Sequence, residues 1–76
     1  MSNTKPEVSS SIDSSLIKEV GYDPFMEVLT VNFRSGGVYE YIEVPEKVYN
    51  DLIEAPSAGK FFHINIKNKF QFLRRK

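Results

Sequence analysis

The chain has 76 residues, in which ten Lys/Arg balance ten Asp/Glu and cysteine is absent. This length predicts a single domain, and a chain without cysteine has neither disulfides nor thiolate metal sites to reinforce its core. The sequence does not begin with a positively charged segment followed by an apolar stretch, and no apolar run approaches the roughly 20 residues of a membrane span, so we expect a soluble, cytoplasmic protein without membrane contact.

Residues 1–13 contain two isolated apolar side chains after the initial methionine, among several serines. Too little apolar surface is available there to offset the conformational entropy lost on ordering, so we expect a disordered N-terminal leader. The folded domain is then predicted to occupy residues 14–76.

The segment that follows the leader alternates apolar and polar residues, as a half-buried strand does. Its apolar positions are Leu16, Val20 and Tyr22, and Gly21 suggests a bulge. Asp23 and the proline after it predict a turn at the end of this strand.

Two further strands are predicted on either side of a glycine-containing turn. Residues 25–33 form the first strand, residues 34–37 form the turn, and residues 38–44 form the returning strand, which ends at a proline that has no N–H for the ladder. Alternation places three apolar residues of the first strand on one face: Leu29, Val31 and Phe33.

Tyr39 and Tyr41 point to one face of the returning strand, and the length of the turn decides which face. A turn of two or four residues sets them across from the Thr30 side, where they form a partly exposed platform for stacking RNA bases. A turn of three residues with a glycine bulge sets them across from the Val31 side, in the core. We favour the core, because a domain this small needs their apolar volume.

A helical period begins after Pro45, a residue that suits a helix start, and Glu46 complements the positive end of the helix dipole. Pro56 disfavours helical geometry in the residue before it, so the helix is predicted to end near Glu54 or Ala55. Its apolar stripe consists of Val48, Tyr49, Leu52 and Ile53.

Residues 57–67 fit two interpretations. Ser57 is a typical cap for a second short helix, in which Phe62 and Ile66 lie one turn apart. Phe62, Ile64 and Ile66 also alternate strictly, as in a strand. Periodicity alone leaves both interpretations open.

Charge is segregated along the chain. Residues 1–54 carry four Lys/Arg and ten Asp/Glu, a net charge of −6, whereas residues 55–76 carry six Lys/Arg and no acid, a net charge of +6. Cations interleaved with phenylalanines suit single-stranded nucleic acid. The interpretation that we favour for the rings themselves is that they are core and that the charges solvate the surface around them. A further alternative is that the acidic and basic segments neutralise each other within the folded monomer. The candidate nucleic-acid contacts are Tyr39, Tyr41, Lys60, Lys67, Lys69, Arg74 and Arg75.

The residues do not assemble into a recognisable catalytic or metal site. His63 is the only histidine and has no carboxylate close to it in sequence, while Glu40 and Glu43 fall on opposite strand faces. Ser57 to Lys60 resembles a minimal phosphate cradle, but a helix cap explains it better. We therefore predict a protein that is not an enzyme and uses no cofactor, metal ion or small-molecule substrate.

An ordered series of motifs runs through the domain: Gly21-Tyr22-Asp23, Leu29-x-Val31-x-Phe33, Ser35-Gly36-Gly37-Val38-Tyr39-x-Tyr41, Val44-Pro45, Ala55-Pro56-Ser57-x-Gly59-Lys60-x-Phe62, Ile66 and Phe70-x-Phe72. Together these residues resemble the KTSC domain, a small bacterial family named for its occurrence at the C-terminus of some lysyl-tRNA synthetases. The final phenylalanine pair departs from the family pattern, in which tyrosine is expected. The resemblance implies an α+β fold, favours a helix over residues 57–67, implies no catalytic activity, and suggests RNA binding through the synthetase fusion.

These features predict a small α+β domain, in which a three- to four-stranded antiparallel sheet packs against one or two short helices and ends in a strand at residues 70–72. The predicted core consists of Leu29, Val31, Phe33, Ile42 or Tyr41, Val48, Leu52, Phe62 and Ile66. We expect a binding module whose partner is RNA. The alternative is a protein-interaction or self-associating module, through paired charges or an added edge strand.

Overall fold

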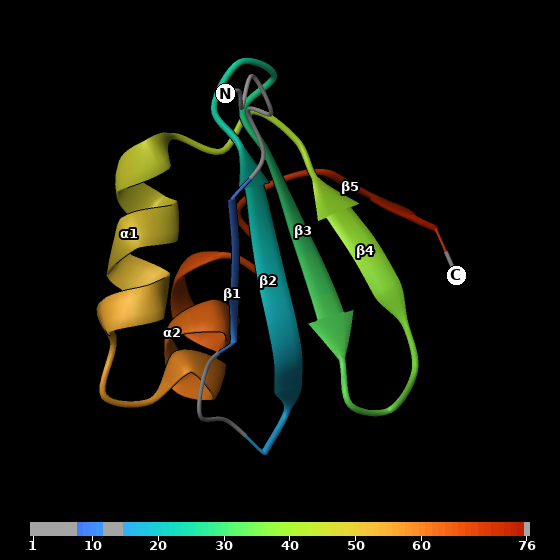
Figure 1. Ribbon diagram of the computed structural model, residues 1–76, viewed down its shortest axis with the longest axis vertical. Helices are drawn as coiled ribbons and strands as arrows, with labels where there is room; N and C mark the ends of the chain where they lie inside the picture. Colours follow the sequence, from blue (N-terminus) through green and yellow to red (C-terminus); the bar gives the residue numbers. More distant parts are fainter. Residues whose placement is uncertain (1–7, 12–14, 76) are drawn as a thin grey trace.

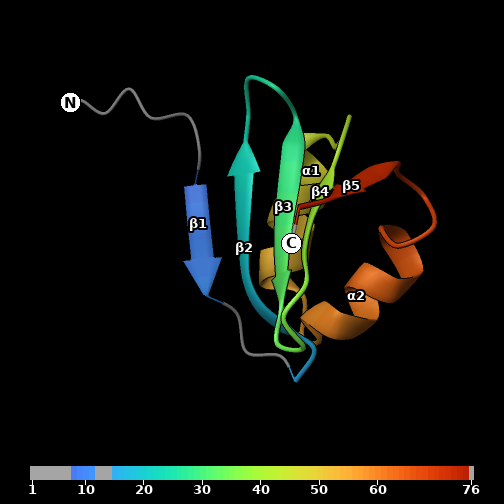
Figure 2. The ribbon, with the colours of Figure 1, turned by 90° about the vertical axis from the view of Figure 1, so that its right-hand side faces the viewer.

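The computed structural model describes residues 8–11 and 15–75. They form an antiparallel sheet in the order β1-β2-β3-β4-β5, with two helices on one side of it (Figures 1 and 2). The predicted α+β class is confirmed, and no helix in the described part of the chain is long and apolar enough to cross a membrane. The elements are β1 (Val8–Ser11), β2 (Ile17–Asp23), β3 (Val28–Phe33), β4 (Val38–Tyr41), α1 (Glu46–Glu54), α2 (Ala58–Asn65) and β5 (Phe72–Arg74).

Strand β1 lies inside residues 1–13, the segment expected to be a disordered leader; the rest of that segment falls outside the described residues. Val8 pairs with Tyr22 and Ser11 with Glu19, antiparallel to β2. This pairing uses backbone N–H and C=O groups and needs no apolar side chain, so the hydrophobic pattern did not reveal it. Strands β2 to β5 are the four expected from the sequence, and β1 adds a fifth.

Strand β2 contains a bulge, but at Lys18 and not at Gly21. The register with β3 shifts between Ile17 and Glu19, whereas Gly21 pairs regularly with Thr30. Without the extra residue, Ile17 and Val20 would point to opposite faces, because they are three positions apart. The bulge therefore brings Ile17 into the core, where it is fully buried.

The turn between β2 and β3 forms at Asp23, as predicted. The Asp23 carboxylate accepts hydrogen bonds from the backbone N–H groups of Phe25 and Met26, at 3.0 and 3.2 Å. Glu27 then adopts a left-handed backbone conformation, with φ of 56°. Strand β3 consequently begins at Val28, three residues after the predicted start.

The hairpin between β3 and β4 has a three-residue loop. Val31 pairs with Tyr39 and Leu29 with Tyr41, and the Phe33 N–H donates to the Gly37 carbonyl at 2.8 Å. Gly36 supplies the positive φ, 110°, that this loop requires. Of the two turn lengths considered, the three-residue one is confirmed, and both tyrosines lie on the core side of the sheet.

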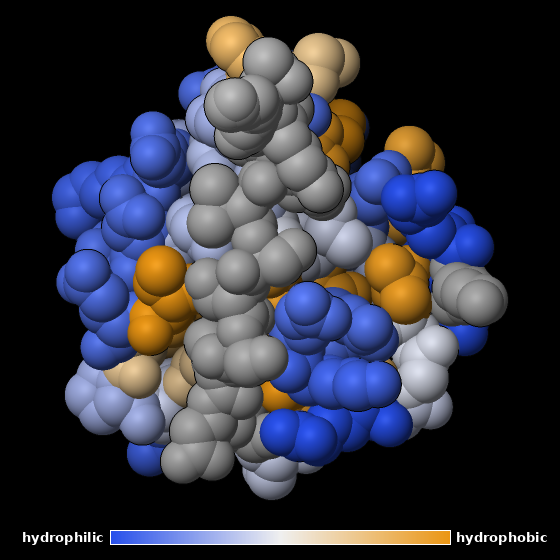
Figure 3. Space-filling model, viewed as in Figure 1, coloured by the Kyte–Doolittle hydropathy of each residue, from blue (hydrophilic) through white to orange (hydrophobic). Residues whose placement is uncertain are grey.

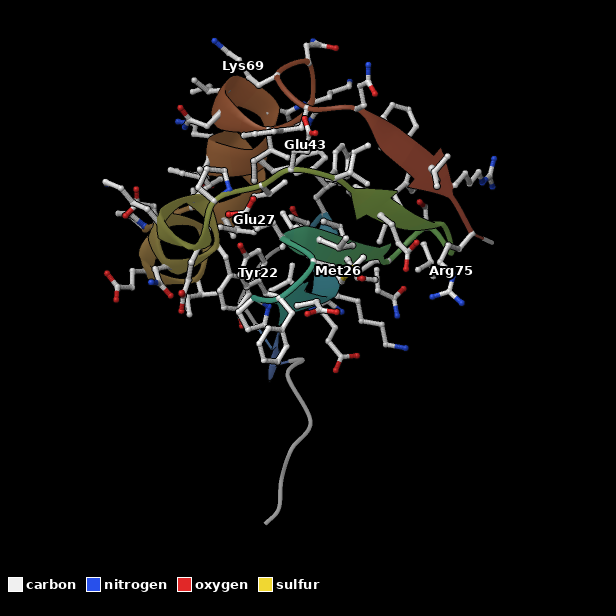
Figure 4. The ribbon with its side chains drawn as sticks, turned by 90° about the horizontal axis from the view of Figure 1, so that it is seen from above. Tyr22, Met26, Glu27, Glu43, Lys69 and Arg75 are labelled. Atoms are coloured by element: carbon white, nitrogen blue, oxygen red, sulfur yellow. The ribbon has the colours of Figure 1, made fainter. Side chains whose placement is uncertain are left out.

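Strand β4 ends at Tyr41, earlier than the expected Val44. Glu43 has a left-handed φ of 58°, which turns the chain out of the ladder, and the Val44 N–H donates to the Glu27 carbonyl instead. Val44 is fully buried in this position. This hydrogen bond connects the turns at Glu27 and Glu43 at one end of the sheet, close to Tyr22 (Figure 4).

Helix α1 runs from Glu46 to Glu54, as predicted from the prolines at its two ends. Helix α2 confirms the helical interpretation of residues 57–67, and the Ser57 hydroxyl accepts a hydrogen bond from the Lys60 N–H at 3.3 Å. A strand would have buried Ile64 with Phe62, but Ile64 is 66% exposed. The helix-cap interpretation of Ser57 is therefore confirmed.

Strand β5 begins two residues later than expected. It covers Phe72–Arg74, with Phe72 paired to Tyr41 and Arg74 to Tyr39. The chain reaches the sheet one residue earlier, because the Ile42 N–H donates to the Gln71 carbonyl at 3.0 Å. Phe70 is half-buried and packs against the core instead of joining the ladder.

The core lies between the inner face of the sheet and the two helices. Of the predicted core residues, Leu29, Val31, Leu52, Phe62 and Ile66 are buried, whereas Phe33 and Val48 are half-buried against it. For one core position the sequence left Ile42 and Tyr41 as alternatives. Tyr41 is the buried residue, because the side chain of Ile42 points to the other side of the sheet. The remaining core residues are Ile17, Val20, Tyr22, Val44, Tyr49 and Ala58.

Candidate nucleic-acid interface

A pocket of about 530 Å³ opens between β4, β5 and the C-terminal half of α2. This volume falls within the roughly 300–1,000 Å³ of typical small-ligand sites. Strands β4 and β5 supply one wall, and Phe62 and His63 from α2 supply the other. Lys67 and Asn68, which follow α2, complete the rim.

The aromatic rings of the pocket form one connected cluster. Tyr39 and Tyr41 are stacked, with ring centroids 6.5 Å apart, and Phe72 lies 5.2 and 5.3 Å from them. Phe62 meets Tyr41 edge to face at 5.5 Å, and Phe33 meets Phe62 at 5.3 Å. Adjacent pairing of β4 and β5 places these rings side by side, because Phe72 is the cross-strand partner of Tyr41.

The two tyrosines do not form the exposed platform that was considered as one possibility. Tyr41 is 3% exposed and Tyr39 is half-buried, so the preferred core assignment holds. A Cβ atom added at Gly37 would lie 2.9 Å from Cε1 of Tyr39, so the glycine makes room for this ring. The accessible ring is Phe72, which is 48% exposed.

Burial raises the pKa of Tyr41 to about 12, with a smaller contribution from the neighbouring Tyr39. The phenol therefore keeps its proton at neutral pH. Its hydroxyl group has no hydrogen-bond partner among residues 8–11 and 15–75. A buried hydroxyl in this position is available to a molecule that enters the pocket.

Two of the predicted cations lie directly at the pocket. Arg74 projects from the inner face of β5, and its guanidinium lies 5.7 Å from the centroid of the Tyr39 ring. Lys67 lies on the opposite rim and also lines the neighbouring pocket formed by residues 67–72. Both residues are exposed.

Two further predicted cations border the same side of the molecule. Lys69 lines the neighbouring pocket that shares Lys67 and Phe72 with the first. Lys60 lines a third pocket, which shares His63 with the first. Among the residues that the structure describes, none that lines these three pockets is acidic. We call this continuous region, with the four cations Lys60, Lys67, Lys69 and Arg74, the basic surface.

Arg75 is not part of the basic surface. It follows Arg74 in β5 and therefore points to the other face of the sheet, where its guanidinium pairs with Glu40 at 3.1 Å. There it lines a separate pocket together with Asp23 and Glu40. Lys69 lies on the helix side of the sheet and Arg75 beyond the end of β5 (Figure 4). The structure thus separates this candidate from the other four cations.

Sequence reasoning missed two residues of the pocket. Phe72 was not among the candidate contacts, because a phenylalanine in place of the expected tyrosine lacks a hydroxyl for a polar contact and was assigned to packing. His63 was expected to be a surface or structural histidine, and it is exposed, but it also joins two pockets. Among the described residues, no group of three or more His, Cys, Asp or Glu is placed to hold a metal ion.

Comparisons with known proteins agree with one another on the fold. The family model of the KTSC domain matches residues 13–70. The crystal structure of a KTSC domain protein from Yersinia pestis superposes with a TM-score of 0.87 and 36% identity, covering 92% of this chain and 99% of that one. A protein of Tsukamurella paurometabola is 40% identical over 60 residues, which cover 79% of this chain and 90% of that protein.

Longer relatives contain a similar segment. The lysine–tRNA ligase of Nostoc punctiforme is 47% identical to this chain over 60 residues, or 79% of the chain. The ligase of Trichormus variabilis matches to the same extent. The matched segment spans only 11% of the length of each ligase.

Proposed function

The chain belongs to the KTSC domain family, and from this premise we propose that it is a non-enzymatic binding module that contacts RNA through the basic surface. The observation that carries the proposal is that no carboxylate of residues 15–75 lines the three adjoining pockets, although ten acidic residues balance the basic ones in the chain as a whole. Charge segregation in the sequence therefore persists as a surface in the fold, at the place where a phosphate backbone would be attracted.

The relatives also support the choice of RNA. Lysine–tRNA ligases act on tRNA, and each carries a segment similar to this chain. A basic module attached to such an enzyme would add a second point of contact with tRNA. The same setting favours a cytoplasmic, bacterial protein for this chain.

The salt dependence of RNA binding tests the proposal. On single strands the logarithm of the affinity falls with the logarithm of salt concentration by about 0.7 for each phosphate contacted. Four cations of the basic surface thus predict a slope of about −2.8, or roughly 50-fold weaker binding at about 200 mM than at about 50 mM salt. Fluorescence anisotropy with a short single-stranded RNA and a tRNA-like hairpin gives this slope.

Matched charge substitutions locate the contacts. We expect Lys67→Gln to weaken RNA binding and to reduce the slope by about 0.7. Lys47→Gln is the control, because Lys47 lies on α1 and pairs with Asp51 away from the basic surface. Arg75→Gln is a second control, and an effect as large as that of Lys67→Gln would contradict the assigned surface. The absence of binding at low salt would refute the proposed function itself.

A protein-interaction or self-associating role is the second candidate, and exposed apolar side chains favour it. Phe25 and Met26 at the turn after β2 are 81% and 69% exposed, and Leu73 on the edge strand β5 is 62% exposed. On the face seen in Figure 3, however, hydrophobic residues form separate patches between hydrophilic areas. Sedimentation velocity over a range of concentrations tests this role, since self-association predicts a concentration-dependent size without any response to RNA.

A further inference from the structure

Phe72 is the one exposed ring among the phenylalanines and tyrosines described in the pocket lining. Phe62 and Tyr41 are almost completely buried and form its floor, whereas nearly half of the Phe72 side chain is exposed. Phe72 is held against Tyr39 and Tyr41 by the pairing of β5 with β4. Phe72 is therefore the phenylalanine ring on which a planar molecule entering the pocket can stack.

The polar groups around this ring define the chemistry of the entering molecule. Lys67 and Arg74 place two positive charges at the rim, and no acidic residue of the described part of the chain lines the pocket. The buried Tyr41 hydroxyl, protonated at neutral pH, is available to donate or accept one hydrogen bond inside. An apolar floor, one internal hydroxyl and a cationic rim fit a flat heterocycle that carries an anionic group at one end.

We propose that this pocket holds one nucleobase with its adjoining phosphate. Phe72 stacks on the base, Lys67 and Arg74 contact the phosphate, and the Tyr41 hydroxyl bonds to a polar edge of the base or to the sugar. This inference rests on the proposed function and deepens it, because it distinguishes the residue that stacks from the residues that only attract the backbone. It also transfers the stacking role from the two tyrosines to Phe72.

The same chemistry is present in a free nucleoside monophosphate and in one nucleotide of a single-stranded RNA. Free adenosine and uridine monophosphates and a short single-stranded RNA are therefore titrated separately, with amide-resolved NMR as the readout. Inorganic polyphosphate serves as a probe with charge but without bases. We expect RNA to shift the amides of Tyr41 and Phe72 as well as those near the four cations, and polyphosphate to shift mainly those near the four cations.

A matched pair of substitutions on β5 tests the stacking role. Phe72→Leu keeps an apolar side chain but removes the ring, and Leu73→Ser changes the next residue, which points to the opposite face and is 62% exposed. We expect Phe72→Leu to weaken RNA binding at least about fivefold, the lower end of the range measured for base stacking, with little change for Leu73→Ser. Polyphosphate binding should be unchanged by both. The amide spectrum of each variant shows that it is folded.

The outcomes separate this inference from the proposed function. RNA binding that survives Phe72→Leu and Tyr41→Phe, with shifts confined to Lys60 and Lys69, would overturn the base-binding pocket and leave the RNA proposal standing. Shifts in the pocket with monophosphates but not with RNA would support the pocket and refute the RNA proposal. If neither RNA nor the monophosphates shift any amide at low salt, both are wrong.

Discussion

Two tyrosines on the inner face of the sheet show how the same side chain serves packing at one place and a candidate site at another. Tyr22 stacks on Tyr49, with ring centroids 5.1 Å apart, and its hydroxyl donates to the Val44 carbonyl at 2.5 Å. Burial raises the pKa of Tyr22, and the nearby Glu27 carboxylate raises it further. Tyr41 is also buried, but its hydroxyl makes no hydrogen bond within the described part of the chain.

This difference predicts opposite results for two conservative substitutions. Tyr22→Phe should lower the free energy of unfolding by about 1–3 kcal/mol, because the Val44 carbonyl loses its partner in a buried environment. Tyr41→Phe is the matched control and should change stability little, since no hydrogen bond within the described protein is lost. Urea denaturation of the unsubstituted protein and of the two variants measures both changes in the free energy of unfolding. Equal losses would show that the Tyr22 hydrogen bond adds nothing to the packing of the ring.

At the scale of single elements, the sequence predicted the helices better than the strands. Helix α1 lies between Pro45 and Pro56, and Ser57 caps α2. The residues at the helix ends were therefore enough to predict where each helix lies. Strand register depends on features that alternation does not reveal: the bulge at Lys18 and the three-residue loop closed by Gly36.

The strand ends were the least predictable part of the fold. A left-handed φ at Glu27 delays β3, and one at Glu43 ends β4 early. The sequence does not suggest this conformation at either position, because glutamate rarely adopts a left-handed φ. The candidate site was difficult to predict for the same reason. The cations could be identified from the sequence, but predicting that Arg74 and Arg75 lie on opposite faces and that Phe72 is exposed requires the register of β5.

The turn conformations predict a pair of opposite stability effects. Glu27→Gly should stabilise the domain by up to about 1 kcal/mol, because glycine adopts a φ of 56° without the steric cost that a Cβ atom brings. Gly36→Ala should destabilise it by about 1 kcal/mol or more, although no atom lies within 4 Å of the added Cβ, because the strain is in the backbone at φ 110°. Thermal unfolding checks both signs, and a neutral Gly36→Ala would show that the loop adapts.

At the scale of the whole molecule, folding distributes the charges by strand face as well as by position in the chain. The acidic and basic halves of the sequence cancel to zero, and the ion pair between Arg75 and Glu40 joins them across β4 and β5. That pair lies on the outer face, whereas no carboxylate of the described residues lines the three pockets that hold the four cations of the basic surface. Composition alone predicted a cancellation and could not predict where it occurs.

The order of the strands has a further consequence, which concerns local unfolding. Short turns join β2 to β3 and β3 to β4. The chain between β4 and β5 is much longer, because it contains both helices. Loop-closure entropy therefore opposes β5 more than any hairpin of the sheet, and an edge strand of three residues has few bonds with which to compensate.

Hydrogen exchange would measure this weakness directly. The amides of Ile42 and Arg75, which bond to Gln71 and Val38 across the β4–β5 ladder, should exchange faster than the Phe33 amide, which closes the hairpin between β3 and β4. Equal protection at all three amides would show that β5 opens only with the entire domain. Faster exchange at β5 would mean that Phe72 and Arg74 leave the pocket together whenever the strand detaches. A bound nucleotide, which contacts both residues, would then stabilise the pairing of β5 with β4.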